Sequence, residues 1–417
     1  MAIHEYKVEN VSLKSLENLY LLSTKRSNAI NTCIQEIQQY INNDKYKSVS
    51  LGVTELTDRH TSENIEMWLL NVADEWKICT NSIIAIVSDN GANIKKAIKD
   101  GFGANKHLSC FAHNLNLVPS KVLESDDISI ICRKVKSIVT YFKKSVAAID
   151  LLRAASDLKL IQSVDTRWSS SHGMLDRFIQ LSDKIGSTLL SFLIAPIMVT
   201  ARELQMLKEF IELLKPFKEA TLIICGENYL TASTAIPITN TLRIKLYNSQ
   251  PETHEGIKMK EQLIEQFELR FDQSAYSNVI NKLAGILNQT NSNKDDCDLP
   301  NINVSTDSFW FYHENLLNEV NSRESSNSSE IPEDFRYYLS QPLIQMDSCP
   351  IQYWKANSNA LHKLGRKYLA DIATSVPCER LFSKTGRIMS ESRNHLNSEH
   401  LQQLIFLGSL SLDDWTL

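Results

Sequence analysis

The spacing of apolar residues predicts a helix near the start of the chain, followed by alternating strands and helices. Residues 12–45 carry leucine and isoleucine at three- and four-residue spacing, which is typical of an amphipathic helix. Val49, Leu51 and Val53 alternate with polar residues, which indicates a half-buried strand. A helix is expected over about 61–76, and the β-branched run 83–87 is typical of a strand buried on both faces.

The same pattern predicts one more helix and one more strand before the chain becomes wholly helical. The helix starts at about residue 92, and the short strand covers 107–111. This alternation favours an α/β layer with some parallel pairing. Residues 128–290 are then typical of successive amphipathic helices, with two of them predicted at 202–214 and 262–287.

The last third of the chain changes character twice. The stretches 288–307 and 322–334 are rich in Asn, Ser and Asp and poor in apolar residues, which predicts long loops or disorder. Residues 337–410 regain helical periodicity, with one apolar stripe through Trp354, Leu361, Leu364, Tyr368 and Leu369 and a second through Leu401, Leu404, Ile405 and 407–410. Two apolar helices in so short a segment must be buried against the core or against another chain.

Composition supports a helical protein and limits how it could meet DNA. The 417 residues include only 12 Gly and 10 Pro, the residues that turn-rich β proteins need. The net charge of −5 argues against DNA binding by bulk charge alone. Residues 133–167 nevertheless hold eight basic and three acidic residues. This local excess fits either a solvated helix face or a phosphate-binding ridge.

The cysteines exclude one class of site and leave another open. The eight cysteines form no C-x-x-C pair, so a structural zinc finger is not expected. We expect reduced thiols and an intracellular protein. The apolar runs are far too short to cross a bilayer, so no membrane role is expected. Cys110 and His113 could share a helix face, but zinc usually takes three or four ligands, so a buried thiol is the simpler interpretation.

Two further positions have alternative interpretations. Asp89 follows an apolar strand and precedes a helix, which suits either a ligand-binding carboxylate or a helix N-cap. Arg167 and Trp168 suit either phosphate binding with base stacking, or a surface charge beside a core aromatic. The local pattern does not choose between these alternatives.

Five motifs, in order along the chain, resemble elements of the hAT superfamily of DNA transposases. The stretch 86–94, I-V-S-D-N-G-A-N-I, resembles the family's strand and D-N-A-A-N-M element. The stretch 110–117, C-F-A-H-N-L-N-L, resembles its C-x-A-H-x-L-N-L helix. Further on, 165–170 (D-T-R-W-S-S), 214–221 (L-K-P-F-K-E-A-T) and 374–383 (T-S-V-P-C-E-R-L-F-S) resemble its T-R-W-N-S, L-x-P-F-x-x-A-T and C-terminal dimerisation motifs.

The resemblance implies an α/β fold with an incomplete RNase H-like core, interrupted by a large all-α insertion and followed by a helical C-terminal dimerisation region. The expected boundaries are a helical segment at 1–45, the first part of the core at 46–190, the insertion at 191–336 and the dimerisation region at 337–417.

The resemblance also implies roles for individual residues. Family members hold two Mg²⁺ ions with two Asp and one Glu, and Asp89 and Glu379 match the second Asp and the Glu. His113, Arg167 and Trp168 match positions that contact DNA, with the tryptophan stacking on an extruded base. Dimerisation is expected to use Trp354, Leu364, Tyr368, Phe382, Leu401, Leu404, Ile405 and Leu407.

The sequence departs from the family in two respects. No stretch resembles the strand T-x-D-x-W-T-S that carries the first Asp, and Asp44 lies in a polar turn instead. No BED zinc finger is found either. We therefore expect a truncated or domesticated, non-catalytic nuclear protein that holds no metal, takes no small-molecule substrate, dimerises, and binds DNA or chromatin partners. The alternative is an active transposase whose first Asp and BED finger are encoded in an upstream exon.

Overall fold

The computed structural model divides the chain into two compact units, Met1–Cys110 with Ala370–Leu417, and Phe111–Leu369. It describes residues 51, 59–164, 167–225 and 232–271, and then 353, 374–376, 378–380 and 401. The helix expected over 12–45, most of the strand expected around Leu51, and the expected loops at 288–307 and 322–334 lie outside these residues.

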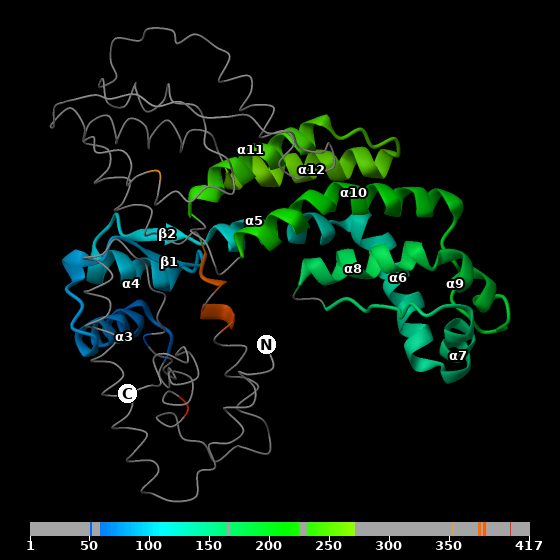
Figure 1. Ribbon diagram of the computed structural model, residues 1–417, viewed down its shortest axis with the longest axis horizontal. Helices are drawn as coiled ribbons and strands as arrows, with labels where there is room; N and C mark the ends of the chain where they lie inside the picture. The colour runs from blue at the N-terminus through cyan, green and yellow to red at the C-terminus, as the bar shows by residue number, and fades with distance from the viewer. Residues whose placement is uncertain are drawn as a thin grey trace, which may run out of the picture. The chain divides into compact units, whose positions relative to one another are not determined.

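The first unit contains the predicted succession of helix, strand, helix and strand (Figure 1). Its elements are α3 (Ser62–Glu75), the 3₁₀ turn η1 (Thr80–Ser82), β1 (Ile86–Ser88), α4 (Ala92–Phe102) and β2 (His107–Ser109). The two strands pair in parallel, with Val87 opposite Leu108. This parallel pairing agrees with an α/β layer, and the strands are shorter than predicted.

The packing of α3 on α4 explains how this unit is held together. Thr61 caps α3 by accepting a hydrogen bond from the backbone of Asn64 at 3.3 Å. Trp76, at the end of α3, is 1% exposed and donates through Nε1 to the carbonyl of Leu51 at 2.8 Å. Ala97 and Ile98 of α4 are fully buried. Trp76, Ala97 and Ile98 therefore belong to the core of this unit.

The second unit is all-helical in its described residues, as predicted for the chain beyond about residue 112. Its helices are α5 (Phe111–Leu123), α6 (Asp126–Lys144), α7 (Val146–Ala155), α8 (Trp168–Gln180), α9 (Ser182–Leu189), α10 (Ala201–Ile224), α11 (Ala232–Asn248) and α12 (His254–Arg270). Helix α10 packs against α5, α8, α11 and α12. Its fully buried Phe217 meets Phe267 of α12 edge to face, with ring centroids 6.4 Å apart. None of the described helices is long and apolar enough to cross a membrane.

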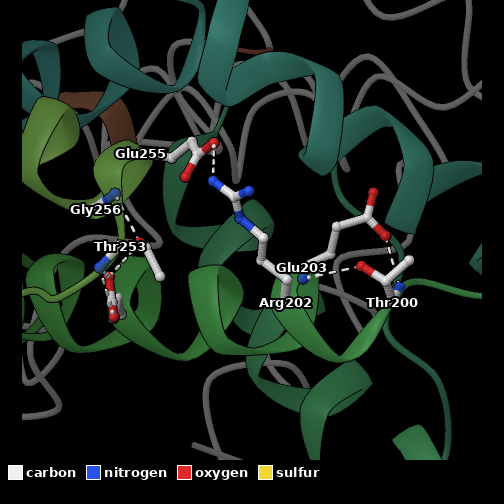
Figure 2. Close-up of polar contacts among 7 residues, drawn as sticks. Thr200, Arg202, Glu203, Thr253, Glu255 and Gly256 are labelled. Atoms are coloured by element: carbon white, nitrogen blue, oxygen red, sulfur yellow. Dashed lines mark hydrogen bonds and ion pairs between the residues drawn. The ribbon is translucent and has the colours of Figure 1, made fainter.

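Side-chain caps fix where α10 and α12 begin (Figure 2). Thr200 accepts from the backbone of Glu203 at 3.2 Å, and the Glu203 carboxylate accepts from the backbone of Thr200 at 2.6 Å, which completes a capping box. Thr253 caps α12, so this helix starts eight residues before the predicted residue 262. Arg202 and Glu255, 3.4 Å apart, join the two helix starts.

His172 should make the second unit less stable in mild acid. This side chain is 3% exposed, and burial lowers its pKa below 6.5, aided by Lys218 and Lys215 and opposed by Asp176. The unfolded chain therefore takes up a proton at a higher pH than the folded chain does. The free energy of unfolding should fall as the pH drops through 6.5 toward the folded pKa, by up to about 1.4 kcal/mol per pH unit in that window.

Urea denaturation at a series of pH values checks this expectation. The variant His172→Gln should lose most of the pH dependence, whereas His60→Gln, which replaces an exposed histidine, should keep it. Equal pH dependence in the wild type and in His172→Gln would contradict the assignment.

Candidate functional site

Asp89 lies at the carboxyl end of β1, where its carboxylate closes a turn. Its Oδ1 accepts a hydrogen bond from the backbone N–H of Gly91 at 3.1 Å. The N-cap of α4 is Gly91 itself, which makes no side-chain cap, so Asp89 does not act as the N-cap considered above. A Cβ at Gly91 would lie 3.1 Å from the same Oδ1, a tight contact. The glycine therefore leaves room for the carboxylate.

Polar contacts between the two strands fix the neighbourhood of Asp89. Ser88 Oγ lies 3.0 Å from His107 Nε2, and Ser109 Oγ donates to Asn90 Oδ1 at 2.7 Å. The backbone N–H of Cys110 donates to the Ser88 carbonyl at 2.7 Å, one residue beyond β2. These bonds place the residues that follow β1 and β2 at one edge of the sheet.

The segment that carries Glu379 returns to this same edge. The backbone N–H of Ser375 donates to Sγ of the fully buried Cys110 at 3.2 Å. The N–H groups of Cys378 and Glu379 bond to the Ser375 carbonyl at 3.0 and 3.2 Å, which forms a helical turn. Burial, then the negative charge of Glu379 and the neighbouring Cys110, raises the pKa of the Cys378 thiol. Asp89 and Glu379, 290 residues apart, thus belong to the same unit and the same end of the strand pair.

Two carboxylates do not fit the two Mg²⁺ ions that the resemblance implies. Each Mg²⁺ demands a near-octahedral shell of oxygen atoms. Across the described positions, no group of three or more His, Cys, Asp or Glu side chains is placed to hold a metal. Asp89 Oδ1 is also committed to its own turn. We therefore derive no cleavage step from these residues, and their metal-binding role stays a prediction.

In the second unit, the side-chain amide of Asn116, from one sequence motif, contacts residues of two others. Trp168 Nε1 donates to Asn116 Oδ1 at 2.9 Å, and Thr221 Oγ1 approaches the same oxygen at 3.5 Å. Asn116 comes from α5, Trp168 from the start of α8 and Thr221 from α10. Sequence reasoning quoted all three stretches but did not single out Asn116. Asn116 could have been found from the sequence, because it lies three residues after His113 and so shares its helix face.

Arg167 and Trp168 are adjacent in sequence but differ in environment. Trp168 is 6% exposed, which agrees with the interpretation of a core aromatic in the free chain. Arg167 is the N-cap residue of α8 and is exposed, and its side chain makes no capping hydrogen bond. His113 is half-buried on α5. The expected contacts of these three residues with DNA stay predictions.

The basic stretch 133–167 is partly neutralised by acidic partners. Lys134 pairs with Glu203 at 2.7 Å, and Arg153 pairs with Asp150 at 3.3 Å. The exposed basic side chains of this stretch include Lys143, Lys144, Lys159 and Arg167. The charge available to a phosphate backbone is therefore smaller than the sequence count of eight suggests.

We assign no ligand to a cavity of about 300 Å³ in the second unit. Its lining includes the carboxylates of Asp127, Glu203 and Glu255. Each of these already has an ion-pair partner within the unit, so the cavity shows no preference for a charged ligand.

One of the residues expected to mediate dimerisation is described. Leu401 is helical and 8% exposed, which places it in a packed environment within the single chain. The other residues expected there, Trp354, Leu364, Tyr368, Phe382, Leu404, Ile405 and Leu407, lie outside the described residues.

The sequence is similar to one protein-family model and to two named proteins. A family model for the hAT family C-terminal dimerisation region matches residues 334–410. "Zinc finger BED domain-containing protein 4" of Homo sapiens is 23% identical over 410 residues, which cover 87% of this chain and 34% of the relative. "Putative AC transposase" of Zea mays is 24% identical over 440 residues, which cover 85% of this chain and 52% of the relative. The chain thus spans between a third and about half of the length of these relatives.

Proposed function

Because this chain is a transposase-derived protein of the hAT family, we propose that it self-associates through residues 334–410 and binds DNA without cleaving it. The match of residues 334–410 to the family's dimerisation region carries the proposal. As a DNA-binding protein it would work in the nucleus, with DNA or chromatin proteins as partners and without a bound metal. The parallel pairing of β1 with β2 supports an RNase H-like core, and α10, α11 and α12 lie within the insertion expected at 191–336.

The support for self-association combines the family match with the apolar stripes in the same residues. Helices that expose a continuous apolar stripe gain most by burying it, and homodimers bury such stripes at two-fold interfaces. Leu401 is already covered within one chain, so we assign the interface to other positions of the stripes.

The support for DNA binding lies on the surface at the start of α8. Arg167 is exposed and makes no cap, so its guanidinium is available to a phosphate. Lys143 and Lys144, also exposed, end helix α6. In a protein with a net charge of −5, such local cations would dominate contacts with the DNA backbone.

The support for a lack of cleavage is chemical. Family members use three carboxylates, and this sequence contains counterparts of two, Asp89 and Glu379. In-line displacement depends on both metal ions being held in register, so the loss of one ligand typically removes most of the rate.

Binding and cleavage can be tested together on the purified 417-residue chain. We expect single-stranded and hairpin DNA to bind with an affinity that falls with salt, and Mg²⁺ or Mn²⁺ to produce no cut strand. Arg167→Glu should weaken binding and reduce the slope of log K against log salt concentration by about one. Lys208→Glu, which reverses an exposed charge on α10 outside the basic stretch, is the matched control and should leave both unchanged.

Three outcomes would contradict the proposal. One is a chain that stays monomeric at tens of micromolar, and another is DNA binding that does not respond to Arg167→Glu. The third is strand cleavage that disappears in Asp89→Ala, which would show that these 417 residues already contain a working set of metal ligands.

A further inference from the structure

An apolar segment between α9 and α10 exposes more aliphatic surface than any other short stretch of the described chain. Leu190, Leu193, Ile194 and Ile197 are 90%, 106%, 91% and 83% exposed. We call residues 190–197 the apolar segment. Single exposed aliphatic side chains scattered over a surface are normal. Four that are almost fully exposed within eight residues form an apolar patch.

The apolar segment is anchored at several points, so its exposure is not that of a free end. The backbone N–H of Phe192 donates to the Leu189 carbonyl at 3.1 Å. The Phe192 ring meets Tyr141 of α6 edge to face, with centroids 6.3 Å apart. Val199, just beyond the segment, is 5% exposed, and the capping box at Thr200 then starts α10. The chain thus turns the four aliphatic side chains outward from a packed base.

The absence of charge narrows the kind of partner that this patch fits. The sequence carries no charged residue between Lys184 and Arg202. Nucleic acid is recognised through cations that contact phosphates, so the apolar segment is unsuited to DNA. An uncharged aliphatic surface resembles instead the buried centre of a protein interface, where charged residues are depleted.

We propose that the apolar segment contacts the same segment of a second copy of this chain. The four side chains expose on the order of 600 Å², most of the roughly 800 Å² that each partner contributes to a standard interface. A two-fold contact between identical uncharged patches brings no like charges together. The inference rests on the self-association proposed above, because residues 334–410 would hold a second copy nearby at a high local concentration.

The first test compares two double variants of the full chain by sedimentation velocity over a range of concentrations. Leu193→Glu with Ile194→Glu should lower the number of chains in the oligomer, or raise its dissociation constant by at least about tenfold. The reason is that four carboxylates would enter one interface. Leu222→Glu with Leu269→Glu replaces leucines that are 70% and 72% exposed on α10 and α12, and should sediment as the wild type does.

The second test asks which surface covers the apolar segment. In Ile194→Cys, a bismaleimide should join residue 194 of one copy to residue 194 of another. Mass spectrometry of the cross-linked peptides identifies this product, because Cys79 and Cys378 are also exposed. Leu222→Cys should give no cross-link between two copies of residue 222. A cross-link from residue 194 to another part of the same chain would overturn the proposal, and so would loss of binding to phosphatidylcholine–phosphatidylserine vesicles in the Glu variants without a change in sedimentation. Self-association that is unchanged in Leu193→Glu with Ile194→Glu would overturn this inference alone, whereas a wild-type chain that is monomeric throughout would overturn the proposed function as well.

Discussion

Replacing Trp168 by alanine is expected to lower the free energy of unfolding of the second unit by about 3–5 kcal/mol. The indole is 6% exposed, so its removal leaves a cavity between α5, α8 and α10. The change also removes the hydrogen bond from Nε1 to Asn116 Oδ1, which is 2.9 Å long. Urea denaturation followed by circular dichroism measures the loss, and a loss below about 1 kcal/mol would show that Trp168 is not a core residue.

Trp168→Phe separates packing from hydrogen bonding. Phenylalanine keeps an aromatic ring but no donor, so we expect a smaller loss of about 1–2 kcal/mol. If the ring also leaves the core to stack on an extruded base, Trp168→Ala should weaken binding of single-stranded DNA by at least about tenfold, and Trp168→Phe should weaken it less. A double-mutant cycle with Asn116→Ala then measures the coupling between the indole and the amide.

Removing Glu268 is expected to cost about 2–3 kcal/mol of unfolding free energy, because it leaves a half-buried guanidinium without its carboxylate. Arg243 of α11 is 14% exposed at its side chain and binds both carboxylate oxygens of Glu268, at 2.8 and 3.0 Å. The guanidinium also lies over the Phe267 ring, 5.5 Å from its centroid. Glu268→Ala leaves this cation with the Phe271 carbonyl, 3.0 Å away, and the Phe267 ring, but without its carboxylate.

The matched control for this prediction is Glu124→Ala. Glu124 pairs with Lys121 at 2.9 Å, but the two side chains are 65% and 54% exposed. Exposed pairs contribute little, so this variant should lose less than about 0.5 kcal/mol. Thermal and urea unfolding of both variants give the comparison, and equal losses would show that the burial of Arg243 does not matter.

Local pattern predicted the order of elements in the first unit but not their limits. The β-branched run at 83–87 and the polar residues after it indicated a strand and then a helix, and both are present. The strand starts later because residues Thr80–Ser82 form a 3₁₀ turn and the Lys106 ammonium binds the Ile83 carbonyl. Such a contact between residues 23 apart has no signature in the apolar spacing.

The candidate site was predictable only where a resemblance supplied long-range information. The return of Glu379 toward the strand end follows from the family motif, and the bond from Ser375 to Cys110 agrees with it. The junction at Asn116 joins residues 52 and 105 positions apart, and the same amide could equally have been a solvated helix residue. The burial of Trp168 was left open for the same reason, because helical spacing does not distinguish a stacking ring from a core ring.

The long sequence separation between Cys110 and Ser375 also determines when their hydrogen bond can form during synthesis of the chain. The strand pair and α4 can close as soon as the residues up to Cys110 have left the ribosome, since their contacts are local. The partner of the Cys110 thiol is 265 residues further on. At about 5–20 residues per second, the thiol waits on the order of ten seconds to a minute before Ser375 exists. During that interval the sulfur atom, which the finished fold buries completely, lacks the hydrogen bond from the Ser375 N–H.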